Sequence, residues 1–199
     1  MQIRKILLSK AFGCLLIATL LFGCSPTFDW RIVRSDDLFF EAMYPAKPSR
    51  AEKSFVVDGK QLVMTMEAAR AADALYAVGT ISLSSTEATA INMSLLMKFL
   101  ENGMLSNLGA LNARPEIVTV RTVGQPSYEL AAKQWHVSGI GPDGAQRSLK
   151  FRLIQRQLSD GRMIVYQVGV LQTETKDALK KTELLNEQHQ TFLNGFRPY

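Results

Sequence analysis

Cysteine and histidine are both scarce in this sequence, and their scarcity narrows the chemistry open to the chain. The 199 residues contain two cysteines, Cys14 and Cys24, and two histidines, His136 and His189. Because both cysteines lie near the N-terminus, the body of the chain offers no internal disulfide, thiolate nucleophile or cysteine-ligated metal. The histidines lack the H-x-x-x-H and H-E-x-x-H spacings of zinc sites. We expect structural or surface histidines and no cofactor, with a histidine site as the alternative.

Catalytic signatures are missing as well. The sequence holds no G-x-S-x-G or S-x-x-K context for a nucleophilic serine, and no P-loop or G-x-G-x-x-G phosphate cradle. Gly139-Ile-Gly141 continues into Pro142-Asp-Gly144, which predicts a turn between strands and lacks the helix that a phosphate loop needs. The sequence therefore favours a protein that is not an enzyme.

The apolar stretch at the N-terminus is too short for a membrane-spanning helix. It covers about 13 residues from Ala11 to Gly23, whereas a spanning helix needs about 20. Arg4 and Lys5 precede it, as in the positive n-region of a signal peptide. We predict a signal peptide at residues 1–23, with an uncleaved anchor as the alternative.

The end of this leader, Leu21-Phe22-Gly23-Cys24, resembles the lipobox of bacterial lipoproteins. The resemblance implies that Cys24 carries diacylglycerol in thioether linkage, together with further acyl chains such as palmitate. Two or three acyl chains anchor a protein stably, since each buried CH₂ contributes about 0.8 kcal/mol. Ser25 follows Cys24 where aspartate would signal inner-membrane retention. The resemblance therefore implies an outer-membrane lipoprotein that faces the periplasm.

An excess of one charge is also absent from the predicted mature chain. Removal of the leader takes away three basic residues, which leaves 20 of the 23 basic residues against 18 acidic ones. A net charge of about +2 is too small to indicate a nucleic-acid partner. The composition, with 47% hydrophobic and 21% charged residues, fits a globular domain with a substantial core.

The body of the chain predicts one α+β domain at 38–199 after a lipidated tether at 24–37. We expect an early strand at 28–34 and a mainly antiparallel sheet, because Asp-Gly pairs at 58–59, 143–144 and 160–161 lie between strand-like runs. The predicted order of elements is four strands, a first helix, four more strands and a second helix at the end. The predicted strands with definite bounds are 38–44, 54–57, 60–69, 75–83, 127–139, 147–158 and 163–171.

Two helices complete the pattern. Ser84-Ser-Thr-Glu87 matches a capping box and predicts a helix that continues to about Leu108, with Gly109 as a left-handed cap. The second helix is expected from about Thr175 to Leu193. Its sheet-facing stripe would contain Ala178, Leu185, Phe192 and Phe196.

The sequence resembles a family of uncharacterised bacterial lipoproteins with a PsbP-like α/β/α sandwich domain. The resemblance rests on Phe40-Glu-Ala-Met-Tyr-Pro-Ala-Lys-Pro48, the Asp-Gly turns and the closing Thr191-Phe-Leu-Asn-Gly-Phe196. It implies a binding or assembly module and brings no set of catalytic residues.

Two surfaces are candidate binding sites. An apolar stripe on the first helix either packs in the core or docks a partner protein of the envelope, and consists of Met93, Met97, Leu100, Met104 and Leu108. Lys150, Arg152 and Arg156 share one face of a predicted strand, and this face either contacts an anion or is solvated.

Three functions stay open. The first is a non-enzymatic binding or assembly module anchored to the membrane through Cys24. The second is a carrier of a small apolar or amphipathic ligand, held in a pocket that includes Met64, Met66, Phe99 and Phe151. The third is an enzyme that modifies envelope components, which needs histidines and carboxylates gathered in a cleft.

Overall fold

The computed structural model describes residues 27–173 and 178–199, except for the side chains of residues 178–184. The predicted signal peptide, Cys24 and the start of the tether therefore lie outside the described residues, as does the side chain of Ala178. Within the described part of the chain, no helix combines the length and the hydropathy that crossing a membrane requires.

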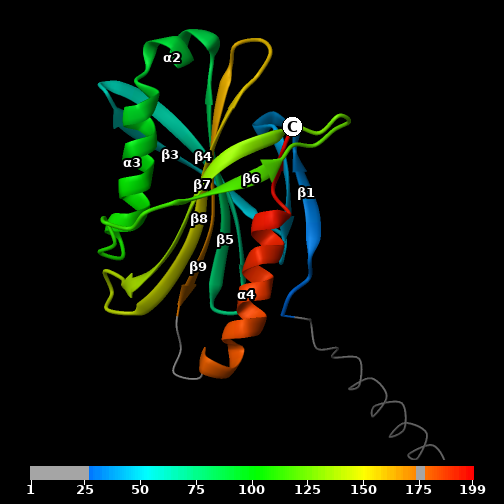
Figure 1. Ribbon diagram of the computed structural model, residues 1–199, viewed down its shortest axis with the longest axis vertical. Coiled ribbons are helices and arrows are strands. Elements are labelled where there is room, and N and C mark those ends of the chain that lie inside the picture. Colours follow the sequence, from blue (N-terminus) through cyan, green and yellow to red (C-terminus); the bar gives the residue numbers. More distant parts are fainter. Residues whose placement is uncertain (1–26, 174–177) are drawn as a thin grey trace, which may run out of the picture.

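The larger sheet in the described chain has seven strands in the order β3-β4-β5-β9-β8-β7-β6 (Figure 1). Each neighbouring pair is antiparallel. This confirms the prediction of a mainly antiparallel α+β domain. The strands are β3 (Ser49–Val57), β4 (Lys60–Ala71), β5 (Ala74–Leu83), β6 (Glu116–Arg121), β7 (Glu129–Ile140), β8 (Gln146–Gln157) and β9 (Met163–Thr173).

A smaller antiparallel sheet has the order β1-β2-β10 in the described residues. Its strands are β1 (Arg31–Ser35), β2 (Phe40–Tyr44) and β10 (Arg197–Pro198). The predicted strand at 38–44 begins later than expected, because a 3-10 turn, η1 (Asp36–Leu38), precedes it and Phe39 has a φ of 60°. The last residues of the chain thus pair with the first residues of β2, Arg197 with Glu41 and Pro198 with Phe40.

Tight turns keep sequential strands together. Asp58 and Gly59, with φ values of 53° and 70°, connect β3 to β4, and Val57 pairs with Lys60. Positive φ at both central residues gives the turn a twist that matches the twist of the paired strands. In the turn between β4 and β5, only the first central residue, Ala72, has a positive φ, of 49°.

The predicted first helix is two helices, α2 (Ser85–Ala90) and α3 (Met93–Ser106). The expected capping box of Ser84 and Glu87 begins α2. Ile91 then adopts an extended conformation, and the side chain of Asn92 accepts a hydrogen bond from the N–H of Leu95 to start α3. The single-helix prediction was wrong because apolar periodicity continues across this second cap.

The predicted left-handed cap at Gly109 is confirmed. Gly109 has a φ of 64°, and its N–H donates to the carbonyl of Ser106. The N–H of Ala110 donates to the carbonyl of Leu105, which completes the Schellman pattern of a helix C-terminus.

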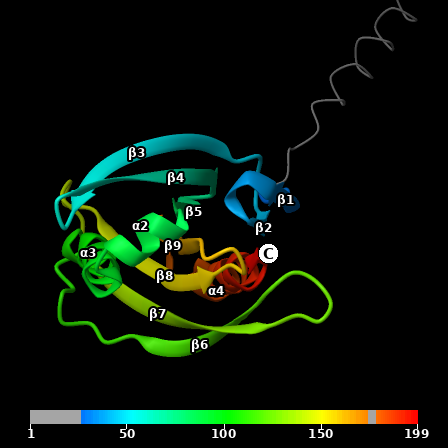
Figure 2. The same cartoon turned by 90° about the horizontal axis from the view of Figure 1, so that it is seen from above.

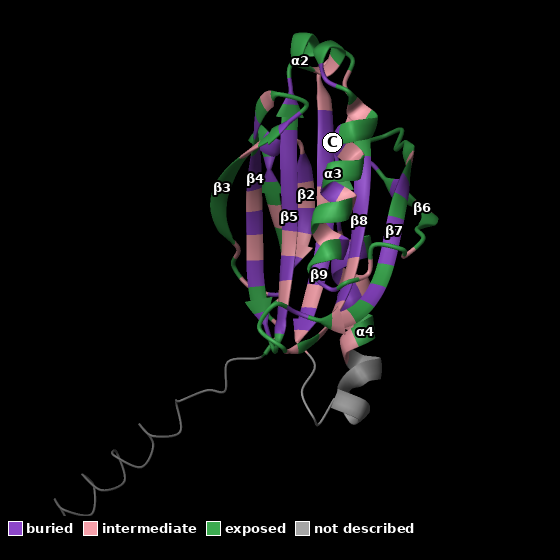
Figure 3. Cartoon of the chain, turned by 90° about the vertical axis from the view of Figure 1, so that its left-hand side faces the viewer, coloured by how far each residue is buried: buried purple, intermediate pink, exposed green. Residues whose placement is uncertain are grey.

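Helices cover the large sheet on both faces. Figures 1 and 2 show α3 on one side of the central strands and α4 (Ala178–Asn194), together with the small sheet, on the other. Double coverage explains why β5 and β9 are almost continuously apolar, since both of their faces are buried. Figure 3 shows the central strands as mainly buried and the edge strands β3 and β6 as mainly exposed.

The sheet separates two hydrophobic clusters. The cluster on the α4 side is rich in aromatic side chains and includes Phe40, Tyr44, Tyr76, Tyr166, Phe192 and Phe196. The cluster on the α3 side is mainly aliphatic around one stacked aromatic pair and includes Leu62, Met64, Leu96, Leu105, Trp135 and Phe151.

Candidate functional site

The basic face of β8 lies beneath α4, so the expectation of a solvated face is wrong. Arg152 is 6% exposed. Its Nε donates to Oε1 of Gln134 at 2.8 Å, Nη1 to the carbonyl of Leu193 at 2.7 Å and Nη2 to Oδ1 of Asn194 at 3.1 Å. Because Leu193 lies in the last turn of α4, this guanidinium caps carbonyls that the helix itself leaves unpaired. Arg152 is thus a structural cation.

Lys150 and Arg156, the other two predicted anion contacts, are half-buried. Burial lowers the pKa of Lys150, and the neighbouring charge of Arg152 lowers it further. Burial also lowers the pKa of Arg156. Arg152 lines a hollow of about 400 Å³ together with Glu129, Arg121 and Arg197. Because Gln134, Leu193 and Asn194 already engage the guanidinium of Arg152, we do not propose an anion contact at Arg152.

The methionine stripe of α3 faces the sheet. Leu100 and Leu108 are buried, while Met93, Met97 and Met104 are half-buried and pack against the α3-side cluster. Of the two predictions for these residues, packing in the core fits their positions, and docking of a partner is not supported.

The opposite face of α3 is the exposed one. Leu95 and Phe99 are 45% and 44% exposed. The ring of Phe99 stacks on Phe55 of β3 with 5.3 Å between ring centroids. The apolar surface available on α3 therefore includes Leu95 and Phe99, which lie outside the predicted methionine stripe.

The histidines occupy unlike surroundings. His136 is exposed on β7, and burial of its ring lowers its pKa, with Lys150 as a second cause. His189 is 6% exposed and contacts Tyr76 edge-on, with 6.0 Å between ring centroids. Burial lowers the pKa of His189 to about 4, so the ring is neutral near pH 7. Among the described residues, no group of three or more histidine, cysteine, aspartate and glutamate side chains could hold a metal ion.

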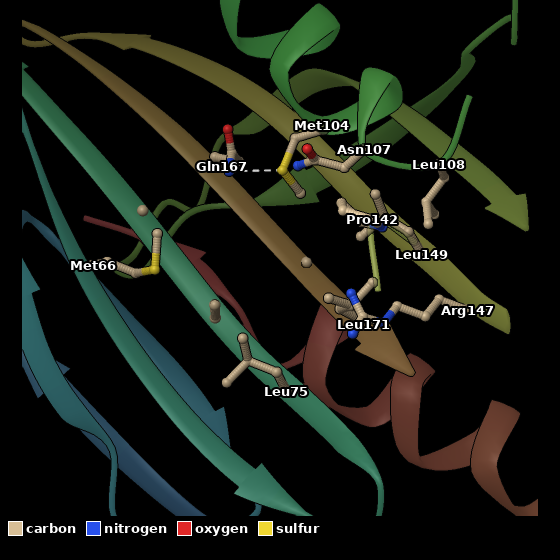
Figure 4. A pocket seen from close by; sticks show the side chains of 13 residues that line it. Met66, Leu75, Met104, Asn107, Leu108, Pro142, Arg147, Leu149, Gln167 and Leu171 are labelled. Carbon is tan, nitrogen blue, oxygen red and sulfur yellow. Dashed lines mark hydrogen bonds between the residues drawn. The ribbon is translucent and has the colours of Figure 1, made fainter. Parts of the chain in front are cut away.

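A pocket of about 330 Å³ lies between the large sheet and the C-terminal end of α3 (Figure 4). Met66 and Leu75 lie on one side of it, and Met104, Leu108 and Leu149 lie on the other. The remaining lining residues come from the middle of β5 and β9, the end of α3 and the β7–β8 connection: Ala77, Gly79, Asn107, Pro142, Arg147, Gln167, Gly169 and Leu171. Its volume falls at the lower end of the range for small-molecule sites, about 300–1,000 Å³.

Small residues on adjacent strands form part of the floor of this pocket. Ala77 and Gly79 of β5 pair with Gly169 and Gln167 of β9, which places two glycines and an alanine on the pocket floor. A Cβ at Gly79 would come within 2.8 Å of the Sδ of Met64, and a Cβ at Gly169 within 2.9 Å of the Cβ of Phe151. Glycine inside a strand often marks a close approach of this kind.

Polar groups occupy only part of the lining. Gln167 of β9 donates from Nε2 to the Sδ of Met104 at 3.1 Å, which holds the methionine over the floor (Figure 4). Arg147 contributes the one charged side chain among the lining residues. A second hollow, of about 380 Å³, differs because Lys98, Glu101 and Lys133 line it. The α3-side pocket therefore suits a largely apolar molecule.

Arg147 is incompletely paired at the pocket. Its Nη2 lies 2.6 Å from Oδ2 of Asp143, whose Oδ1 accepts from the N–H of Ala145. The Nε of Arg147 is buried and has no hydrogen-bond partner among the described residues. A buried donor without a partner costs about 1–3 kcal/mol, so the Asp143 ion pair leaves one donor of Arg147 unused.

The sequence predicted an internal pocket but placed it imprecisely. Met66 lines the pocket as expected, whereas Met64 and Phe151 lie in the core beside it and Phe99 is on the exposed side of α3. Arg147, Gly79 and Gly169 were missed. The glycines inside strand-like runs were the signal that could have located the floor.

No protein-family model matches this chain, and no curated protein matches it either. The residues and geometry described above therefore carry the functional argument.

Proposed function

We propose that this chain is a lipoprotein of the bacterial cell envelope, anchored through lipid on Cys24, whose domain binds a small amphipathic ligand without catalysing a reaction. Leu21-Phe22-Gly23-Cys24 supports the anchor, and Ser25 supports the outer membrane with the domain in the periplasm. The arrangement of helices on both faces of an antiparallel sheet supports a PsbP-like α/β/α sandwich.

The observation that carries the ligand proposal is the open apolar floor beneath α3. The hollow beneath α3 has a volume of about 330 Å³ and opens to solvent, and most of its lining residues are apolar. Ligand sites are clefts of this kind, mostly apolar with a few polar groups. Of the three functions considered, ligand binding is the one that this space favours.

Photo-crosslinking tests the proposal in the intact molecule. The lipidated full-length protein is placed in phospholipid nanodiscs with a long-chain alkyl carboxylate that bears a diazirine on its chain, and the labelled peptides are identified. We expect labels on the peptides that contain Leu75 and Met104. Labelling at Cys24 alone, or spread evenly over the surface, would contradict a pocket ligand.

A pocket-filling variant supplies the matched test. Ala77→Leu puts three more carbon atoms on the floor of the pocket, and we expect it to abolish the Met104 label. Val63→Leu enlarges a side chain that is 45% exposed on the neighbouring strand β4 and should leave the label unchanged. Equal labelling in the two variants would remove the pocket from consideration.

Docking to an envelope protein is the second candidate function. The observation that favours it is the exposed face of α3, where Leu95 and Phe99 adjoin Phe55. If this face binds a protein, the Leu95→Glu, Phe99→Glu double variant loses one in-cell crosslinked partner while the Met104 label persists. If the double variant keeps both its crosslinked partner and the Met104 label, this face has no binding role.

A further inference from the structure

We propose that the pocket selects molecules with one apolar chain and an anionic end group, and that Arg147 binds this group in place of Asp143. The inference rests on the proposed function, since it names the chemical class of the ligand that the α3-side pocket takes. Neither the basic face of β8 nor the sequence pattern pointed to Arg147.

The pocket lining is apolar over most of its extent and carries a cationic group at one end. Figure 4 shows Met66, Leu75, Met104 and Leu149 around the pocket, with the guanidinium of Arg147 at one end of it. Among the described residues that line the pocket, Arg147 is the only charged one. A molecule that filled the space with an apolar chain would therefore bring one end to a cation. Carboxylate and phosphate groups match the planar fork of a guanidinium, which binds them through two parallel hydrogen bonds.

The present partner of Arg147 uses only one of those two contacts. Asp143 meets Nη2 through Oδ2, while its Oδ1 is held by the N–H of Ala145. The Nε of Arg147 is left without a partner. The side chain of Asp143 is 57% exposed, so water can solvate the carboxylate once it is released. Asp143 thus holds the guanidinium in the unloaded protein and yields to an anion that can use both contacts.

Space around this ion pair is restricted. A Cβ at Gly141 would lie 2.9 Å from Nη1 of Arg147 and 3.0 Å from Oδ1 of Asp143. The missing side chain at Gly141 therefore allows the β7–β8 connection to fold closely over the ion pair. The guanidinium is thereby kept at the pocket instead of extending into solvent.

The pocket also lies at the end of the domain where the tether begins. It is lined by the start of β5 and of β8 and by the end of β9, and in Figure 1 these ends lie at the same end of the large sheet as the start of β1, which is on the opposite face. Trp30 contacts Tyr76, whose neighbours Leu75 and Ala77 line the pocket on the opposite face of β5. Cys24 and Arg31 are seven residues apart, which limits their separation to about 25 Å. A lipidated Cys24 would keep the pocket near the bilayer surface, where single-chain amphipaths gather.

Four probes with the same diazirine-bearing chain test the selection. They end in a carboxylate, a phosphate, a hydroxyl or a trimethylammonium group, and each is titrated into nanodiscs that carry the lipidated protein. We expect the carboxylate and phosphate probes to label the Met104 peptide with affinities at least tenfold higher than those of the other two. A stronger carboxylate signal points to free fatty acids, and a stronger phosphate signal points to single-chain phospholipids.

Variants separate Arg147 from general effects of charge. Arg147→Gln should remove the preference for anions and leave binding of the hydroxyl probe unchanged, whereas Asp143→Asn should raise affinity for the anionic probes several-fold. Arg162→Gln and Asp160→Asn are the matched controls, because they alter another aspartate–arginine pair in a strand connection, with 2.7 Å between Nε and Oδ2. These controls should change nothing.

The outcomes distinguish the two levels of the proposal. If no probe labels the pocket, the proposed function fails. If all four probes bind equally, or if Arg147→Gln keeps the preference for anions, the pocket remains a binding site and the selection by Arg147 is wrong. If Asp143→Asn weakens binding of the anionic probes, the competition between Asp143 and the ligand is wrong.

Discussion

The two faces of the large sheet are built on different principles. On the α4 side, Phe192 and Phe196 interlock with Tyr44 and Tyr166 at centroid separations of 5.2–5.5 Å, and Arg152 ties the helix end to β8. On the α3 side, Gly79 and Gly169 line a hollow together with the flexible side chains of Met66 and Met104. One face is thus closely packed, and the other contains the pocket that we propose holds a ligand.

Removal of an aromatic side chain from the α4 face should have the largest effect on stability. Phe192 is fully buried and contacts both Tyr44 and Tyr76. We expect Phe192→Ala to lower the free energy of unfolding by about 3–5 kcal/mol. Met104→Ala on the other face should cost about 1 kcal/mol, because Met104 is half-buried beside an existing space. Urea denaturation of the full-length protein in nanodiscs measures both, and equal losses would contradict the contrast.

Arg152 should rank next. Replacement by alanine leaves the carbonyl of Leu193 and the amide oxygen of Gln134 buried without their donor, which should cost about 2–3 kcal/mol. Arg121→Ala breaks an exposed ion pair to Glu129 and should change stability by less than about 0.5 kcal/mol. If Arg152→Ala proved as mild as Arg121→Ala in the same denaturation experiment, its role at the end of α4 would be wrong.

The two glycines of the pocket floor should respond unequally to alanine. A Cβ at Gly169 meets the Cβ of Phe151 at 2.9 Å, and this atom cannot move without the backbone of β8. We expect Gly169→Ala to cost about 1–3 kcal/mol. At Gly79 the obstacle is the Sδ of Met64, a flexible group that can turn aside, so Gly79→Ala should cost about 1 kcal/mol or less. Thermal unfolding compares the two variants, and the reverse order would contradict the described packing.

The last expected effect, a pH dependence of the α4 face, vanishes near neutral pH and appears only in acid. Burial lowers the pKa of His189 to about 4, with Lys150 and His136 as further causes, while an unfolded histidine titrates near about 6.5. Between these values the unfolded state binds a proton that the folded state does not. The free energy of unfolding should therefore fall as the pH falls from about 6.5 to about 4, with no contribution above that window.

Variants at the two histidines isolate this effect. His189→Gln should flatten the pH dependence in that window, as measured by urea denaturation at neutral and acidic pH. His136→Gln should leave most of it in place, because the ring of His136 is more exposed. An unchanged pH profile in His189→Gln would show that other groups are responsible.

Local signals in the sequence predicted the parts of the fold that local chemistry determines. The antiparallel α+β class followed from period-two runs and turn residues, and the capping box at Ser84 and the cap at Gly109 were found where a side chain or a φ angle specifies them. The boundary at Ile91 was missed because apolar periodicity persists through it. The first half of β3, from Ser49, was missed because its polar residues lie on an exposed edge and do not alternate.

The candidate site was harder to predict because it depends on contacts between distant segments. Whether Arg152 faces solvent or a helix is decided by where α4 packs, and a strand pattern does not encode that choice. The pocket floor likewise requires Ala77 to pair with Gly169 across β5 and β9, which only the strand register reveals. Arg147 becomes notable once its unpaired Nε is seen beside an apolar space.

Methionine methyl NMR tests the central claim most directly. In the lipidated protein with ¹³C-labelled methionine methyls, Met66 and Met104 line the pocket, whereas Met43 of β2 and Met163 at the far end of β9 do not. When a long-chain alkyl carboxylate is added, we expect the signals of Met66 and Met104 to shift in a saturable manner while those of Met43 and Met163 stay in place. Shifts at all four methionines, or at none of them, would contradict a ligand pocket beneath α3.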